Sequence, residues 1–293
     1  MMYYIVLFFV KLVSLLPFRL LYGLSDFMYL IFYRIIKYRK NVVRKNLTLS
    51  FPEKPASEIE QIEKKFYHHF CDLIVEGIKL KSISGKELEK RMKFYESEQL
   101  IEHYHEGRSV MLMASHYGNW EWTSLFSKYL PKDKPVYQVY KKQSGKIVDR
   151  MIGDIRQRFG ARNVDMKHIL RTIIEMKREN KMGMFGMISD QRPRLDSIHY
   201  WTTFLNQETA IIDGTEQIAK KFNFPVYYCS FNKVKRGYYT CTFVCLSTDP
   251  QNTGEHEITE KYARLLEADI KQAPEFWLWT HNRWKHGTRG KKV

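Results

Sequence analysis

The fold of this chain is best predicted from the stretch Ser109-Val110-Met111-Leu112-Met113-Ala114-Ser115-His116-Tyr117-Gly118-Asn119-Trp120-Glu121. Its first six residues form an apolar run typical of a buried strand, and the apolar spacing that follows Glu121 indicates a helix. The strand therefore ends just before His116, and Glu121 begins the next helix. This arrangement delivers a histidine into a loop, with a carboxylate five residues later.

His116 and Glu121 are suited to proton transfer. Neutral imidazole can take a proton from a hydroxyl nucleophile, while a nearby carboxylate fixes its tautomer and stabilises the imidazolium that forms. We predict that His116 is a general base oriented by Glu121; the structural alternative is that His116 only caps the helix. Among ten histidines, roughly one is expected by chance to have an acidic residue at any chosen distance along the chain, so other features must support the pair.

Beyond this stretch, strands and helices alternate along the chain. The order predicts an α/β fold with a mixed, mainly parallel central sheet flanked by helices. Ser57 and Asp165 are placed to cap two of the helices. Strands are expected over 109–114, 135–140 and 182–189, a β-hairpin over 225–247 with its turn at 235–237, and helices over 57–81, 121–130, 146–159, 165–180, 209–222 and 257–272.

Polar loops follow two of the expected strands. His116 follows the first, and Asp190-Gln191-Arg192-Pro193-Arg194 follows the strand over 182–189. Ligands of α/β sheets bind beyond the carboxyl ends of the strands. We therefore expect the two loops to share one cleft.

The N-terminal fifty residues are basic and apolar, with eight Lys or Arg against a single acid, Asp26. Lys11, Arg19 and Asp26 interrupt the apolar run before it reaches the roughly 18–20 residues of a clean membrane-spanning helix. The pattern favours an interfacial or re-entrant helical pair over one true span, and either over a cleaved signal peptide. We predict a membrane anchor over residues 1–36 and a catalytic domain over 37–293, with the basic segment 34–45 against anionic lipid on the cytoplasmic side.

Charge and cysteine content restrict partners and compartment. The net charge of +16 predicts an anionic partner. Charge alone does not distinguish among nucleic acid, an acidic lipid surface and an acidic carrier protein. The four cysteines form no Cys-x-x-Cys pair and are expected to be buried free thiols in a reducing compartment. Three of them, Cys229, Cys241 and Cys245, lie in expected core strands.

Several motifs in this order resemble the lipid A biosynthesis acyltransferases, the bacterial late acyltransferases of the lysophospholipid acyltransferase superfamily. The most specific is Pro274-Glu275-Phe276-Trp277-Leu278-Trp279-Thr280-His281-Asn282-Arg283-Trp284-Lys285, which is similar to the C-terminal signature of the family. The resemblance covers nearly the whole chain. Its other segments are 15–19, 43–47, 51–53, the His-x4-Glu motif of His116 and Glu121, Asp190 with Pro193-Arg194, and 209–226.

The resemblance implies transfer of a fatty acyl group from an acyl thioester, usually on acyl carrier protein, to a hydroxyl of a membrane glycolipid such as a lipid A precursor. It places the enzyme at the cytoplasmic face of the bacterial inner membrane and requires no cofactor. The deprotonated hydroxyl would attack the thioester directly, without a covalent enzyme intermediate. Backbone N–H groups of Gly118 and Asn119 are the expected oxyanion donors.

Four further side chains are predicted to bind substrate. Asp190 would bond to sugar hydroxyls of the acceptor, or pair with Arg192 or Arg194. The cations Arg156, Lys167 and Arg194 would bind lipid phosphates, or form a solvated basic face. His281 and Arg283 would serve structure or contact the headgroup, and Trp277, Trp279 and Trp284 would mainly pack in the core and at interfaces.

The chain departs from the family at two places, Thr203-Phe204-Leu205-Asn206 in place of a Phe-Phe-Gly segment and Met166 in place of a common arginine. Both lie where acceptor or phosphate contacts are expected, so the acceptor is less well defined than the chemistry. An aminolipid or lysophospholipid acceptor stays open, as does an acyl-CoA or phospholipid donor.

A non-enzymatic membrane- or nucleic-acid-binding protein is the other class of function that stays open, although no nucleic-acid module is recognised. The pairs His68-His69 and His103-Tyr104-His105 lack zinc-site spacing, so no metal is expected.

Overall fold

The computed structural model describes residues 2–131, 135–142 and 145–285. Its centre is a seven-stranded sheet in the order β1-β9-β8-β2-β5-β3-β4. Every neighbouring pair is parallel except β8 and β9, which form an antiparallel hairpin. The strands are β1 (Met92–Tyr95), β2 (Val110–Ala114), β3 (Val136–Tyr140), β4 (Arg162–Asp165), β5 (Met184–Ile188), β8 (Val226–Lys235) and β9 (Tyr238–Ser247).

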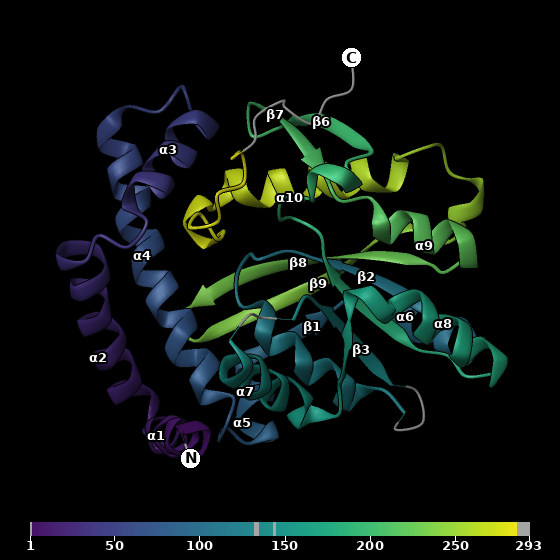
Figure 1. Cartoon of the computed structure of the whole chain (residues 1–293), viewed down its shortest axis with the longest axis horizontal. Coiled ribbons are helices and arrows are strands. Elements are labelled where there is room, and N and C mark those ends of the chain that lie inside the picture. Colours follow the sequence, from purple (N-terminus) through teal and green to yellow (C-terminus); the bar gives the residue numbers. More distant parts are fainter. Residues whose placement is uncertain (1, 132–134, 143–144, 286–293) are drawn as a thin grey trace.

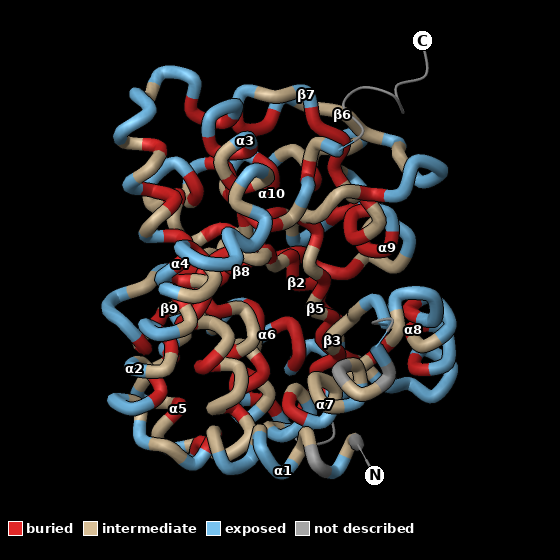
Figure 2. The backbone as a smooth tube through the Cα atoms, turned by 60° about the vertical axis from the view of Figure 1, so that its left-hand side comes forward, coloured by how far each residue is buried: buried red, intermediate tan, exposed pale blue. Residues whose placement is uncertain are grey.

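Helices cover both faces of this sheet, so its central strands are buried (Figures 1 and 2). Helices α9 and α10 lie on one side together with a two-stranded sheet of β6 and β7, and α5 and α7 lie on the other (Figure 1). The bounds are α5 (Gly85–Arg91), α6 (Glu98–His105), α7 (Lys146–Arg156), α8 (Ile169–Arg178), α9 (Gly214–Phe222), α10 (Glu257–Gln272), β6 (Tyr200–Phe204) and β7 (Gln207–Ile211). The predicted mixed, mainly parallel α/β sheet is confirmed.

Strand β2 contributes almost only buried side chains because it has a parallel neighbour on each side and helices on both faces. Parallel strands buried in this way read as continuous apolar runs rather than alternating ones. This is why the run 109–114 could be recognised as a strand from its sequence. The hairpin of β8 and β9 and the helix over 257–272 were also predicted correctly.

The predicted helix over 209–222 was wrong in its first part. Residues 207–211 form strand β7, which pairs with β6, and α9 begins only at Gly214. The hairpin turn at Leu205 and Asn206 has positive φ at both residues, 49° and 60°. Turns of this type usually contain Asn-Gly, so Leu-Asn gave no turn signal. The buried carboxylate of Glu267 stabilises the turn by accepting the Leu205 N–H at 3.0 Å.

Other differences concern the bounds and types of elements. The helix expected from Ser57 is α4 (Ala56–Lys79), which begins after Pro55 without a side-chain cap. The helix expected over 121–130 is a 3-10 helix, Trp120–Tyr129. Residues 162–165 form β4, and Asp165 caps the short 3-10 turn Met166–His168 before α8. Strand β1 and helices α5 and α6 were not predicted, and Cys245, expected to be buried, is exposed.

The N-terminal segment folds as two helices packed along α4 (Figure 1). Helix α1 (Met2–Leu15) is followed by α2 (Phe18–Tyr29), which continues into a π-helical turn, Leu30–Ile35. Ser25 donates a hydrogen bond to Asp72 of α4 at 2.8 Å, and Asp26 pairs with Arg236. In the described residues no single helix has the length and apolar character to cross a membrane, but residues 6–15 and 18–35 satisfy both criteria together, with a 119° bend between them.

Candidate active site

The carboxyl ends of β2 and β5 bring His116 and Asp190 together. The strands are parallel neighbours, with Ala114 opposite Ile188, so the loops that follow emerge at the same edge of the sheet. The Nδ1 atom of His116 lies 2.8 Å from Oδ1 of Asp190, and the His116 backbone N–H donates to Oδ2 at 2.9 Å. The two predicted strand-end loops therefore do share one site.

Asp190 is built to stay ionised. Its side chain is buried and accepts a third hydrogen bond, from the indole Nε1 of Trp277 at 2.8 Å. Burial alone would raise the pKa of Asp190, but the interaction with His116 and these hydrogen bonds outweigh burial and hold the pKa below its usual range. An ionised Asp190 accepts the Nδ1 proton of His116, which leaves Nε2 as the basic nitrogen.

The C-terminal segment 274–285 forms the frame of the His116 loop. Leu278 N–H donates to the His116 carbonyl at 3.1 Å, and Gly118 N–H donates to the Phe276 carbonyl at 3.0 Å. Gly118 has φ of +61°, and a Cβ atom there would lie 2.8 Å from Cβ of Phe231. Glycine is therefore required at this position by both conformation and space. The signature motif and the His-x4-Glu motif are two halves of one site.

The Nε2 side of His116 contacts Gln191, and Trp120 packs against the ring. The Gln191 amide nitrogen lies 3.2 Å from Nε2, and the Trp120 ring packs edge-on against the imidazole with centroids 5.0 Å apart. The His116 side chain keeps 18% of its surface exposed, whereas that of Asp190 keeps 2%. The imidazole thus bonds to a buried carboxylate at Nδ1 and contacts a neutral amide at Nε2, and its side chain stays partly exposed.

Glu121, predicted to orient the imidazole, bonds to other groups. Its carboxylate forms a bidentate ion pair with Arg156, with Nε at 2.8 Å from Oε2, and accepts the indole N–H of Trp120 at 3.1 Å. Burial raises the pKa of Glu121, but the lowering by Arg156, Trp120 and the nearby His116 is larger than this increase. The pKa of Glu121 therefore lies below its usual range. Glu121 is thus a second negative charge near His116, and the hydrogen bond to Nδ1 comes from Asp190.

The other predicted binding residues have different partners in the structure. The Asn119 side chain donates to Glu76 at 2.7 Å, and the Gly118 N–H is used by Phe276, so it is unavailable as an oxyanion donor. Arg156 is occupied by Glu121. Lys167 is exposed on the turn before α8, and Arg194 is exposed and paired with Asp196 at 2.7 Å. Asp190 pairs with neither Arg192 nor Arg194, since its partners are His116 and Trp277.

Glu76 of α4 is a buried carboxylate that the sequence did not reveal. It accepts hydrogen bonds from Asn119 at 2.7 Å and from the hydroxyls of Tyr22 and Tyr239, each at 2.9 Å. Burial raises its pKa to about 7. Because Tyr22 lies on α2 and Asn119 lies in the His116 loop, Glu76 links the N-terminal helices directly to the candidate active site. No spacing in the sequence signals a contact between residues so far apart.

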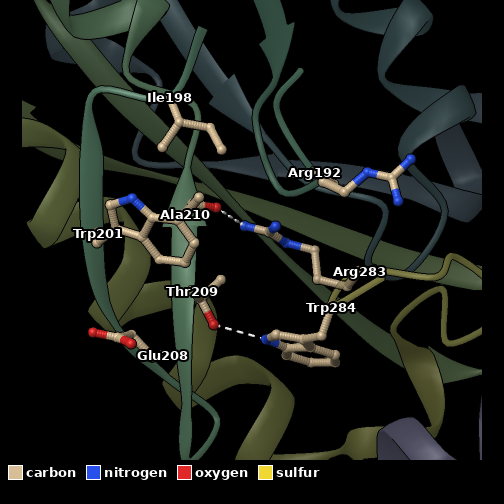
Figure 3. Close-up of a pocket in the computed structure, with 8 residues that line it drawn as sticks. All are labelled: Arg192, Ile198, Trp201, Glu208, Thr209, Ala210, Arg283 and Trp284. Atoms are coloured by element: carbon tan, nitrogen blue, oxygen red, sulfur yellow. Dashed lines mark hydrogen bonds between the residues drawn. The ribbon is translucent and has the colours of Figure 1, made fainter. Parts of the chain in front are cut away.

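Arg283 and Trp284 bond to strand β7 (Figure 3). Arg283 donates to the Ala210 carbonyl, and the Trp284 indole N–H donates to the Thr209 hydroxyl at 2.7 Å. They line a small cavity of about 20 Å³ together with residues of β6 and β7. Burial lowers the pKa of Arg283 to about 10. Of the two roles expected for Arg283, structure or headgroup contact, its bond to Ala210 is consistent with the structural one. Within the described residues, no group of three or more His, Cys, Asp or Glu side chains is arranged to hold a metal ion.

The chain was compared with known proteins. The sequence profile of the bacterial lipid A biosynthesis acyltransferases matches residues 1–286. A curated relative, a lipid A biosynthesis acyltransferase of Haemophilus influenzae, is 22% identical over 279 residues, which cover 93% of this chain and 84% of the relative. The match includes both halves of the site described above. The chain belongs to the bacterial lipid A biosynthesis acyltransferase family and is an acyltransferase.

Proposed function

We propose that this protein transfers a fatty acyl chain from a thioester on acyl carrier protein to a hydroxyl of a lipid A precursor, at the cytoplasmic face of the bacterial inner membrane. The observation that carries the proposal is the hydrogen bond between His116 and the buried, ionised Asp190. It occurs in a chain whose family acts in lipid A biosynthesis. The family match supplies the reaction and the acceptor class, and the His116–Asp190 pair supplies the base.

In this mechanism, His116 Nε2 takes the proton of the acceptor hydroxyl, which replaces Gln191 beside it. The alkoxide attacks the thioester carbonyl, and the tetrahedral intermediate expels the carrier thiolate, which recovers the proton from His116. Asp190 orients the imidazole through Nδ1 and stabilises the imidazolium. Glu121 adds a second negative charge, held in place by Arg156.

The tetrahedral oxyanion requires hydrogen-bond donors that are not already bonded. Of the two backbone groups predicted from the sequence, only the N–H of Asn119 is a candidate, because the Gly118 N–H bonds to Phe276. Asn119 immediately precedes the 3-10 helix Trp120–Tyr129, whose first N–H groups carry partial positive charge. The fixed Glu76 bond of the Asn119 side chain would hold this backbone group still.

We propose a membrane anchor over residues 1–36 and a catalytic domain over 37–293; residues 1, 132–134, 143–144 and 286–293 lie outside the described residues. Large apolar side chains are exposed all along α1, α2 and the π-helical turn, although soluble proteins rarely gather so many in one region. They favour an interfacial helical pair that rests on the bilayer. The exposed residues are Tyr4, Phe8, Phe9, Leu12, Leu15, Leu20, Phe27, Leu30, Ile35 and Ile36.

Substitution of Phe8 and Phe9 by serine should weaken binding to vesicles that contain anionic lipid. Both rings are about 60% exposed on α1, so their loss removes apolar contact with lipid and leaves the folded core intact. Co-sedimentation with vesicles measures the effect. Leu195→Ser removes an apolar side chain that is also exposed, at 50%, but outside this segment. Equal binding by the two variants would contradict the anchor.

The proposed activity is tested with the purified full-length protein in detergent. Acyl-acyl carrier protein is offered with a lipid A precursor, a lysophospholipid or an aminolipid, and products are read by mass spectrometry. We expect one added acyl chain on the lipid A precursor. Acylation of the lysophospholipid or aminolipid alone would keep the chemistry and change the acceptor, and no transfer to any acceptor would contradict the proposal.

A further inference from the structure

A cavity of about 460 Å³ lies beside the active site, lined by Arg39, Val42, Arg192, His281, Asn282 and Lys285. We call it the basic pocket. Three of its six lining residues are Arg or Lys and none is Asp or Glu. The pocket is a different cavity from the small one of Figure 3, where the guanidinium of Arg192 points away from Ala210 and Trp201.

Three separate segments build the basic pocket. Arg39 precedes α3 (Lys40–Ser50) with a left-handed φ of 50°, and its guanidinium donates to the Thr280 carbonyl at 3.0 Å. Asn46 of α3 donates to the carbonyls of Trp279 and His281, at 3.0 and 2.9 Å. These bonds join α3 to the C-terminal segment. They hold the pocket open in one arrangement before any ligand binds, which lowers the entropic cost of binding.

The cations of the pocket are not paired with carboxylates in the part of the chain that the structure describes. Among residues 2–131, 135–142 and 145–285, no carboxylate lies within ion-pair distance of Arg39, Arg192 or Lys285. Arg156 and Arg194, by contrast, are each paired with a carboxylate. A concave site lined by unneutralised cations attracts anions, and guanidinium groups match the geometry of phosphate oxygens.

His281 adds a hydrogen-bond donor to the pocket but no charge. Burial lowers its pKa to about 4, so the ring is neutral at pH 7. Its Nε2 accepts the backbone N–H of Arg192 at 3.3 Å, which places the ring proton on Nδ1. The ring thus orients the backbone that carries Arg192 and offers one N–H.

The pocket shares its walls with the catalytic histidine. Arg192 follows Gln191, whose amide contacts His116 Nε2, and is two residues from Asp190. On the other wall, Leu278 bonds to the His116 carbonyl three residues before His281. An anion bound here would lie next to the loops that carry His116 and Asp190, so a phosphate group of a substrate is the expected occupant.

We infer that the basic pocket binds a phosphate group of one of the two substrates, an inference that rests on the proposed acyl transfer. Two sources share this chemistry: a phosphorylated sugar headgroup on the acceptor, and the phosphodiester of the pantetheine arm on the donor. Phosphate recognition is thereby assigned to Arg39, Arg192 and Lys285, in place of the predicted Arg156, Lys167 and Arg194.

The test is steady-state kinetics of Arg192→Gln and Lys285→Gln, with the full-length protein. Loss of one charge-assisted contact to phosphate should raise the KM of the phosphate-bearing substrate by about 10- to 100-fold and leave kcat nearly unchanged. Arg171→Gln is the matched control, since Arg171 is exposed on α8 and paired with Glu175. Lys285 is exposed, so its variant should fold even if Arg192→Gln does not.

Modified substrates identify the source of the phosphate. If the acceptor supplies it, the variants raise the KM of the acceptor, and the effect vanishes with a dephosphorylated acceptor. If the donor supplies it, the variants raise the KM of the donor, and the effect vanishes with an acyl thioester of N-acetylcysteamine, which has no phosphate. KM values for both substrates within twofold of those of Arg171→Gln would overturn the inference.

A binding measurement separates this inference from the proposed function. Inorganic phosphate is titrated into the detergent-solubilised protein, and the line width of its phosphorus NMR signal is followed. Broadening with wild-type protein and with Arg171→Gln, and its loss in Arg192→Gln and Lys285→Gln, would support the pocket even if no acyl transfer were found. Equal broadening in all four proteins would overturn the pocket even if transfer were found.

Discussion

Replacement of His116 by alanine should lower kcat for acyl transfer by about 10²–10⁴-fold, the usual contribution of a general base. Without His116, the substrate hydroxyl would have to lose its proton to water. Among the described residues, no other basic side chain contacts His116 Nε2. Gln191, the neighbour at 3.2 Å, is an amide and cannot accept a proton at neutral pH. Initial rates with acyl-acyl carrier protein and a lipid A precursor measure the loss.

The control for this variant is His105→Ala. His105 lies at the end of α6 and is exposed, so its removal tests the effect of losing a histidine outside the site. We expect wild-type rates from it. The His116 variant should keep its thermal stability within a few degrees, since the imidazole is partly exposed. A His116→Ala enzyme with more than one tenth of the wild-type kcat would exclude His116 as the base.

The sequence was most informative where a local pattern decided the structure. The hairpin of β8 and β9 has a recognisable turn and helix α10 has a helical apolar spacing, so they were predicted with nearly correct bounds. The buried run 109–114 was recognised because a central parallel strand has no polar face. Where periodicity was short, as in 207–211, strand and helix patterns could not be separated, and the hairpin of β6 and β7 was missed.

The candidate active site was predictable only in part, for a different reason. His116 was found because it follows a recognisable strand, and Asp190 was found as a residue of a second strand-end loop. Their pairing depends on β2 and β5 being neighbours in the sheet, although β3, α7, β4 and α8 lie between them in the chain. Sequence spacing instead favoured Glu121, which is near in the chain and bonds to Arg156.

The same limit explains the other long-range contacts of the site. The C-terminal signature was recognised as a motif, but its bonds to the His116 loop were not foreseeable from its residue types. Arg39 and Arg192 are ordinary basic residues in the sequence, and only the fold gathers them with Lys285 around one cavity. The net charge of +16 indicated an anionic partner. The site where an anion binds can be located only from the tertiary structure.

Substitution of Asp190 by asparagine should lower kcat by about 10³–10⁴-fold, the size of loss found when the orienting carboxylate of a His-Asp pair is neutralised. The amide has nearly the same shape, so the bonds from Trp277 and from the His116 backbone can persist in part. The negative charge that holds the Nδ1 proton and stabilises the imidazolium is lost. The measurement is kcat under saturating donor and acceptor.

Glu121→Gln is the decisive comparison, because it neutralises the other carboxylate near His116 and leaves the bond at Nδ1 intact. We expect its kcat to exceed that of Asp190→Asn by at least tenfold. Its main effect should come from Arg156, which loses its ionised partner. Exchange of Arg156 for glutamine in the same protein removes this unpaired charge and should recover part of the activity. If Glu121→Gln were instead the more damaging of the two single substitutions, Glu121 rather than Asp190 would be the carboxylate that supports the base.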